Sequence, residues 1–347
     1  MKHKSKDIAI INKDLARTRR AIVGLGCSYV WGKGAYDLEL LQEEKPLAPG
    51  AWGDWDYRDR GHEQATLKRL GEKFNLPFYQ DRNTLDTALM ENQNSFVTQL
   101  AEVELNNTYT PINLGEPGNG NLSAIDRLFI YDIDWHLADE IIVVFMATDL
   151  LRTDLVSSHL QEFSKIGQDY RAIFPTDKTK DELVTPTDYL EYGYTQTTIE
   201  TSYEYRFLLR NYKVLSKWCN MYNAKLLIFP AFRALPTFDE MIQDFAGRTP
   251  DGVDLDNLTD GQLDAFRYIK AAPHNNVINI QNHKSFGDWL LTLDGVDASK
   301  YDILDIVHNK KIAIDHNYLT PCGHPSKIAH AMLATELATV FKDRNWI

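Results

Sequence analysis

The stretch Glu140-Ile141-Ile142-Val143-Val144-Phe145-Met146, EIIVVFM, decides the fold class of this chain. Six consecutive apolar residues, Ile141 to Met146, are typical of a strand that is buried on both faces, as the strands of parallel sheets are. Four further β-like runs, each bounded by turn residues, lie at 21–26, 110–114, 224–229 and 276–280. The sequence therefore predicts five short strands.

Helical patterns separate these runs. They cover residues 94–105, 122–137, 199–222 and 325–341, and the last pattern has Pro325 near its first turn and an apolar stripe along one side. Strands that alternate with helices predict βαβ crossovers. We therefore expect an α/β fold with a doubly wound, mostly parallel five-stranded sheet.

The chain is expected to form one domain over residues 20–347, with long loop insertions. Three segments are longer than an ordinary connection but have too few core-forming runs for domains of their own, at 33–63, 153–198 and 233–275. Residues 1–19 form a basic N-terminal extension, which is either a solvated flexible leader or an arm that docks on nucleic acid or another partner.

The charge balance argues against nucleic acid as the main partner. Among 347 residues, 37 basic and 49 acidic side chains give a net charge of −12, whereas phosphate binding needs a basic footprint. No apolar run approaches the roughly 18 residues that span a bilayer, and the N-terminus lacks the apolar region of a signal peptide. With only three cysteines, unpatterned for zinc, the sequence predicts a cytoplasmic protein without membrane association or a disulfide framework.

An acidic patch at 251–260 raises the question of a calcium site. Its aspartates do not have EF-hand spacing, because Leu258 stands where a ligand is wanted. We therefore expect a solvated acidic loop and no metal site.

Polar side chains and glycines follow the predicted strands, at the edge where open parallel sheets bind ligands. Ser28 follows the first strand in Gly26-Cys27-Ser28, and His324 precedes the last helix in GHPS. Two polar turns lie between them, NLGEPGNGN at 113–121 and MATDLLR at 146–152. A hydroxyl, a base and accessible backbone N–H groups are what acyl transfer needs, and this chemistry requires no cofactor.

In this order, the four blocks resemble those of the SGNH (GDSL-type) hydrolases, a superfamily of esterases, lipases and carbohydrate deacetylases with a flavodoxin-like, three-layer α/β/α fold. The resemblance extends from Gly26 to Ser326 but leaves out the insertions. It implies that Ser28, in Gly-Cys-Ser where the family has Gly-Asp-Ser, is the nucleophile. It also implies that the N–H of Gly118 belongs to the oxyanion hole and that His324 is the base.

Two positions depart from the family pattern. The third block usually supplies an asparagine amide to the oxyanion, but Thr148 stands there, so its hydroxyl is the implied donor. The family's aspartate three residues before the histidine is replaced by Pro321. Asp315, nine residues before His324, is the nearest upstream acid that could orient the imidazole, and the alternatives are Asp149 or a backbone carbonyl.

Four residues around these blocks are assigned to the substrate side of the site, namely Cys27, Asn119, Asp149 and Arg152. Several of them have a second interpretation. Cys27 is alternatively a small buried residue, or one of two thiols that meet at the site with Cys322. Asn119 is alternatively a turn-former. Arg152 either binds a substrate carboxylate or pairs with a surface aspartate.

The sequence thus favours a serine esterase or other acyl hydrolase, which removes an O-acetyl or similar group from a carbohydrate. The Tyr and Trp residues of the insertions are suited to stacking on sugar rings or to a protein interface, including one that makes a homo-oligomer. The alternative is a catalytically weak or inactive protein of the same fold with a binding or structural role, for instance in a phage particle (virion). Gly-Cys-Ser variants of the first block look like those found in phage and environmental bacterial genomes.

Overall fold

The structure of the chain is a computed structural model. It describes residues 2–32, 35, 93–115, 120–148, 153–156, 170–173, 201–235, 240, 276–301, 303, 317–319 and 324–347, with the backbone alone at 2–7, 153–156, 170–173 and 201–209.

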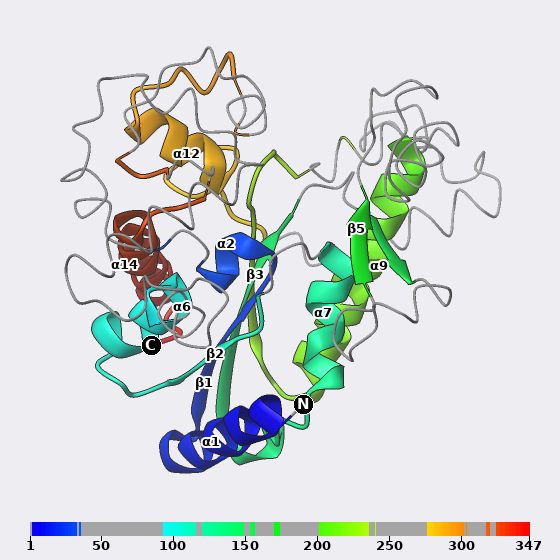
Figure 1. The fold of residues 1–347 in the computed structure, drawn as a ribbon, viewed down its shortest axis with the longest axis vertical. Coiled ribbons are helices and arrows are strands. Elements are labelled where there is room, and N and C mark those ends of the chain that lie inside the picture. Colours follow the sequence, from blue (N-terminus) through cyan, green and yellow to red (C-terminus); the bar gives the residue numbers. More distant parts are fainter. Residues whose placement is uncertain are drawn as a thin grey trace.

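Helices and strands alternate along the chain, as Figure 1 shows. The helices are α1 (Lys2–Thr18), α2 (Ser28–Trp31), α6 (Phe96–Gln99), α7 (Asn121–Ile130), α9 (Thr201–Met221), α12 (Phe286–Leu293) and α14 (Lys327–Asp343), with a π-helical turn η3 (Leu100–Glu104) and a 3-10 turn η4 (Trp135–Leu137). The strands are β1 (Arg20–Leu25), β2 (Thr110–Asn113), β3 (Glu140–Ala147), β4 (Thr153–Val156), β5 (Tyr170–Ile173) and β6 (Lys225–Pro230).

The main sheet is parallel and has the strand order β2-β1-β3-β6. Its centre is β3, whose last seven residues are all buried. The α/β class and the parallel sheet are therefore confirmed, and four of the five predicted runs are strands. In the described residues the sheet has four strands rather than five, because the run at 276–280 contributes only an isolated parallel bridge between Val277 and Ile228.

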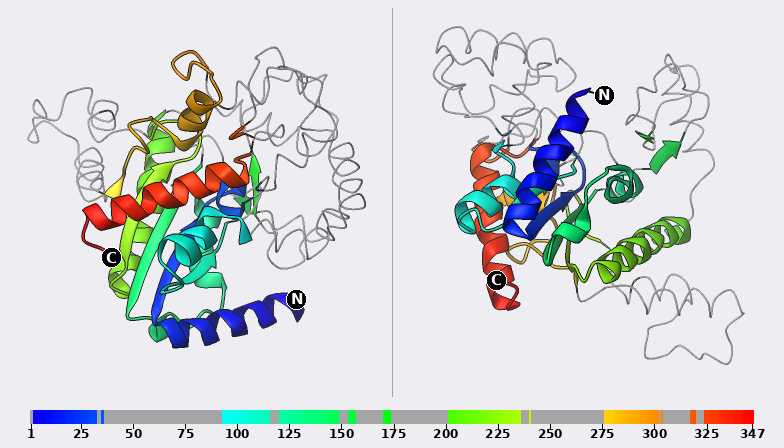
Figure 2. Two further views of the ribbon diagram at one scale, coloured as in Figure 1. Left: turned by 90° about the vertical axis from the view of Figure 1, so that its left-hand side faces the viewer. Right: turned by 90° about the horizontal axis from the view of Figure 1, so that it is seen from below.

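Side chains of the sheet alternate between two hydrophobic clusters, one on each face. One cluster receives Ile22, Val144 and Phe229 and packs against α6, α12 and α14. The other receives Val23, Phe145 and Ile228 and packs against α1, α7 and α9. Figure 2, viewed from below, shows α6 and α14 on one side of the sheet and α7 and α9 on the other. Helices thus cover both faces.

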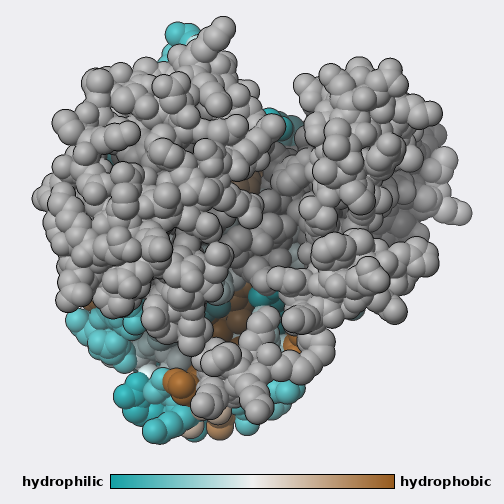
Figure 3. All heavy atoms as spheres, viewed as in Figure 1, coloured by the Kyte–Doolittle hydropathy of each residue, from teal (hydrophilic) through white to brown (hydrophobic). Residues whose placement is uncertain are grey.

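The N-terminal segment is part of the fold where its side chains are described. Leu15 of α1 is fully buried beside Ala21 and Val23. The Thr18 and Thr110 hydroxyls lie 2.7 Å apart, and the Asn12 amide donates to the carbonyl of Asp132. The flexible leader is therefore the wrong interpretation here, because α1 has an apolar stripe that the sheet and η4 cover. Figure 3 shows a mostly hydrophilic outer surface at the lower end, where α1 runs in Figure 1.

Two predicted helices are shorter than the sequence pattern indicates. The pattern at 94–105 becomes a single α-helical turn, α6, followed directly by the π-turn η3. The pattern at 122–137 stops at Ile130 because Tyr131 is extended, and a short 3-10 turn then carries Trp135 onto Trp218 at a ring distance of 5.0 Å.

The predicted insertions lie largely outside the described residues. Within 153–198, strands β4 and β5 form an antiparallel pair of their own. Among the described helices, none is long and apolar enough to cross a membrane.

Candidate active site

The turn after β1 presents Ser28 at the first residue of α2. Gly26 has φ +153°, and a Cβ there would lie 2.7 Å from the carbonyl oxygen of Met146. Only glycine fits this close approach to β3. Cys27 then caps α2 in an extended conformation, and its carbonyl accepts the N–H groups of Val30 and Trp31. The chain thus turns directly from the end of a buried strand into the serine.

Residues at the end of β2 hold α2 in place. The Asn113 amide donates to the carbonyl of Val30 at 2.8 Å, and its oxygen accepts the N–H of Gly115. A Cβ on Gly115 would lie 2.5 Å from the nitrogen of Trp31, so the two segments pass with no space for a side chain. Asn113 therefore holds the helix that bears Ser28.

His324 is held by its neighbours just before α14. Pro325 forms an antiparallel bridge with Leu319, and the N–H of Ser326 donates to the carbonyl of Tyr318 at 2.7 Å. The Ser326 hydroxyl donates to the carbonyl of Asn317 and accepts the N–H of Ala329, which caps α14. The segment 317–319 thus holds the residues that follow His324.

Ser28 and His324 lie together, although they are 296 positions apart in the sequence. The Nε2 atom of His324 is 3.0 Å from the Ser28 hydroxyl oxygen, within hydrogen-bond distance. Ser28 is 7% exposed. The ring of Tyr29 meets that of His324 edge-on at 5.8 Å, and that of Phe232 at 4.8 Å. Tyr29 of α2 therefore packs against His324 on one side, and Phe232, which follows β6, packs against Tyr29.

Thr148 lies at the same edge of the sheet. Leu25 pairs with Phe145 in the β1–β3 register, so Ser28 and Thr148 each come three residues after a paired position. The Asn121 side chain binds the Thr148 backbone twice, accepting its N–H at 2.8 Å and donating to its carbonyl at 3.2 Å. Any hydrogen bond from Thr148 to a reacting group must therefore come from its hydroxyl, because its N–H is already used.

Five predicted site residues lie outside the described residues, namely Gly118, Asn119, Asp149, Arg152 and Asp315. Asn121 was not among the predicted site residues, although it ends the polar turn after β2. Its position at the start of α7, directly after Gly120, was the available signal.

The Cys27 thiol is buried in the hydrophobic cluster of α6, α12 and α14. This burial favours the interpretation of a small core residue over contact with substrate. Cys219 is likewise a free, buried cysteine, and burial raises the pKa of its thiol to about 12. Cys322, the proposed companion of Cys27, lies outside the described residues.

Across the described ranges, no group of three or more His, Cys, Asp or Glu side chains is arranged to hold a metal ion. At the carboxyl edge of the parallel sheet, the described residues place a serine hydroxyl beside an imidazole.

Comparisons of the chain with protein-family models, with curated proteins and with solved structures found no match.

Proposed function

We propose that the protein is a serine hydrolase that cleaves acyl esters, with Ser28 as nucleophile and His324 as general base. The observation that supports this proposal most is the 3.0 Å approach of His324 Nε2 to the Ser28 hydroxyl. A serine hydroxyl is a weak nucleophile at neutral pH, and an adjacent base activates it by taking its proton. The separation lies within the reach that general-base catalysis requires.

The reaction proceeds in two acyl transfers. The Ser28 oxygen attacks the ester carbonyl carbon while His324 Nε2 accepts the hydroxyl proton, and the proton then passes to the departing alcohol as the ester bond breaks. Water attacks the resulting acyl-serine with His324 again as base, which releases the acid and restores Ser28. In this tautomer the second imidazole proton is on Nδ1.

The negative charge on the carbonyl oxygen needs hydrogen-bond donors. We assign the N–H of Gly118 and the hydroxyl of Thr148 to this role. The two hydrogen bonds from the Asn121 side chain to the Thr148 backbone support the assignment of Thr148, because they fix the backbone that carries its hydroxyl. We assign the orienting acceptor for Nδ1 of His324 to Asp315, with Asp149 or a backbone carbonyl as alternatives.

The proposed relation to the SGNH hydrolases rests on the sequence blocks and on the strand order. If residues 276–280 are counted beside β6, through the Val277–Ile228 bridge, the order becomes that of a flavodoxin-like doubly wound sheet. The layering of helices on both faces fits the same architecture. The proposed site lies at the carboxyl ends of the strands, where such sheets bind ligands.

The proposed substrate is an acyl ester of a carbohydrate. Two features support it, the resemblance of the blocks to carbohydrate deacetylases and the Tyr- and Trp-rich sequence of the insertions at 33–63 and 153–198. Aromatic rings with polar edges bind the apolar faces of sugars.

The test combines a fluorophosphonate probe with hydrolysis of a short aryl ester. We expect wild type to label, Ser28→Ala not to label, and hydrolysis by Ser28→Ala and by His324→Ala to fall by roughly 10⁴- to 10⁶-fold. Ser299→Ala is a matched control, because this exposed serine bonds only to Asp297 among the described contacts, and it should label like wild type. His136→Ala, at η4 on the opposite end of the sheet, is the control for the imidazole.

A wild type that neither labels nor hydrolyses faster than Ser28→Ala excludes the hydrolase. The alternative, a binding or structural protein that keeps the fold, is then the better account, and a stable homo-oligomer or co-purification with a particle would support it.

A further inference from the structure

We propose that Asp294 is a positioning residue for His324, acting through the backbone of residues 317–319. This inference rests on the proposed hydrolase function. Asp294 follows the last residue of α12 and is 2% exposed. A buried carboxylate is costly unless hydrogen bonds compensate its charge. Among the described residues, the hydrogen-bond partners of this carboxylate lie on one short segment.

The carboxylate of Asp294 accepts three consecutive backbone N–H groups. Its Oδ1 atom lies 2.7 Å from the nitrogen of Asn317, and its Oδ2 atom lies 2.8 Å from that of Leu319. The N–H of Tyr318 lies between them, at 3.0 and 3.2 Å from the two oxygens. Hydrogen bonds to a charged acceptor are about twice as strong as neutral ones. The segment is thereby fixed along its whole length.

The segment 317–319 in turn holds the chain that follows His324. Leu319 bridges to Pro325, and Ser326 bonds to both Asn317 and Tyr318. A displacement of 317–319 therefore moves the backbone next to the imidazole. No described contact joins Asp294 to Ser28 or to the imidazole of His324. The described connection between its carboxylate and the site runs through this segment.

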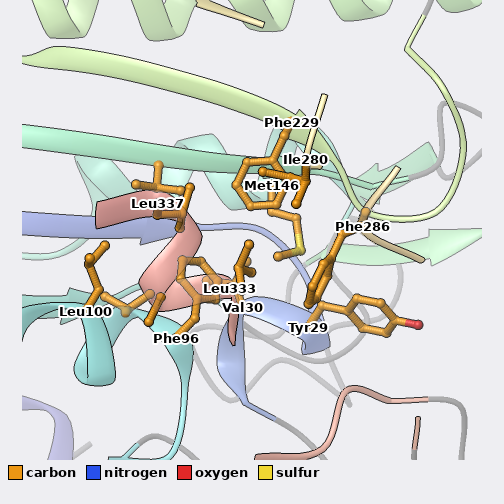
Figure 4. Close-up of a cluster of buried hydrophobic side chains, with 14 of the residues drawn as sticks. Tyr29, Val30, Phe96, Leu100, Met146, Phe229, Ile280, Phe286, Leu333 and Leu337 are labelled. Atoms are coloured by element: carbon orange, nitrogen blue, oxygen red, sulfur yellow. The ribbon is translucent and has the colours of Figure 1, made fainter. Parts of the chain in front are cut away.

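The helix that carries Asp294 is itself anchored beside Ser28. Ser285 caps α12, and its hydroxyl donates to the carbonyl of Phe232 at 2.9 Å. The N–H of Gly287 donates to Ala231, and a Cβ on Gly287 would approach that carbonyl oxygen to 3.1 Å. The ring of Phe286 meets that of Tyr29 edge-on at a centroid distance of 6.2 Å. Figure 4 shows these two side chains as neighbours in the hydrophobic cluster. The residues SFGDWL at 285–290 thus anchor the first half of α12 beside Ser28. Asp294, at the other end of this helix, is the residue that we propose positions the base.

The test compares Asp294→Asn and Asp294→Ala with Asp297→Asn. Asp297 lies on the same loop and carries the same charge, but its contacts are with Ser299 and Lys300 and it is exposed. We expect both Asp294 variants to lower kcat for the aryl ester by about 10²-fold, with KM within about twofold of wild type, because a small misplacement of a catalytic group has this effect. Fluorophosphonate labelling should slow in parallel, and Asp297→Asn should match wild type.

Each rate is divided by the folded fraction of the protein, which near-UV circular dichroism measures. The imidazole resonances of His324, assigned with His324→Ala, should shift in Asp294→Asn and stay unchanged in Asp297→Asn. An active wild type with an equally active Asp294→Asn overturns the positioning role alone. Failure of both Asp294 variants to fold also overturns it, because the residue would then serve the fold. A wild type as inert as Ser28→Ala overturns the proposed function, and this inference with it.

Discussion

The imidazole of His330 is a buried base that the candidate site does not use. It lies on α14, is 0% exposed, and its Nδ1 accepts the N–H of Phe96 at 3.2 Å. That N–H belongs to the first residue of α6, where no helical acceptor is available. In the part of the chain that the structure describes, Nε2 has no hydrogen-bond partner. Burial lowers the pKa of His330 from 6.5 to about 3.

This depressed pKa predicts that acid destabilises the protein through His330. Below pH 6.5 the imidazole of His330 binds a proton in the unfolded chain but stays neutral in the folded chain. Stability is therefore lost as the pH falls toward about 3. Between pH 7 and pH 5 the loss amounts to about 2 kcal/mol. Urea unfolding at both values should show a smaller pH dependence in His330→Asn, whose amide oxygen replaces Nδ1 as acceptor. An equal pH dependence in the variant and wild type would contradict the assignment.

The sequence pattern identifies the side chains that are proposed to react, but it does not identify the residues that hold their surroundings in place. Ser28 and His324 stand out because a hydroxyl and an imidazole follow turn residues in a family-like order. Asp294 and Asn121 do not stand out, because each binds backbone atoms, which every residue possesses. Only the folded chain shows which backbone groups they meet.

The first residues of the strands share one ionic cluster, at the end of the sheet opposite the candidate site. Glu140 at the start of β3 accepts the Tyr109 hydroxyl at 2.9 Å and pairs with Lys225 of β6 and with Arg20 of β1. Lys225 also donates to the carbonyl of Trp346 at 2.7 Å. Burial and the hydrogen bond to Glu140 raise the pKa of the Tyr109 hydroxyl, which stays protonated.

Substitutions at two adjacent acidic residues distinguish the contribution of this cluster to stability from that of an exposed ion pair. Glu140→Gln should lower the free energy of unfolding by about 1–3 kcal/mol, because a half-buried lysine and tyrosine lose a charged partner. Asp139→Asn removes an exposed bidentate pair with Arg19 and should have little effect, since solvent screens it. Urea denaturation at neutral pH measures both. A larger loss in Asp139→Asn would contradict the ranking.

Elements with continuous apolar sequence were predictable, and those that depend on tertiary context were not. The run that became β3 is apolar from Ile141 to Ala147, as a strand that is buried on both faces requires. The run at 276–280 has only Val277, Ile278 and Ile280 among asparagines, and it forms one bridge beside β6. The helix α1 was missed because its lysines suggested a solvated leader, whereas Leu15 is fully buried against the sheet.

The two hydrophobic clusters share the sheet between them, so we expect the described core to unfold as one unit. Leu337 on α14 fills one cluster and Leu215 on α9 fills the other, and both are fully buried. Each Leu→Ala substitution should cost about 2–5 kcal/mol. Thermal unfolding followed by circular dichroism should show a single transition in wild type, in each variant and in the double variant, with nearly additive losses. Two separate transitions in either single variant would show that the faces unfold independently.

The distance of 296 positions between Ser28 and His324 has a consequence for biosynthesis. Strands β1, β2, β3 and β6 are all complete at Pro230, before α12 and His324 have been translated. At usual elongation rates, the ribosome needs roughly 5 to 20 s to translate residues 231–324. During that interval the nascent polypeptide can already contain its central sheet, yet Ser28 lacks its proposed base. The proposed hydrolytic activity therefore cannot arise before His324 has been translated.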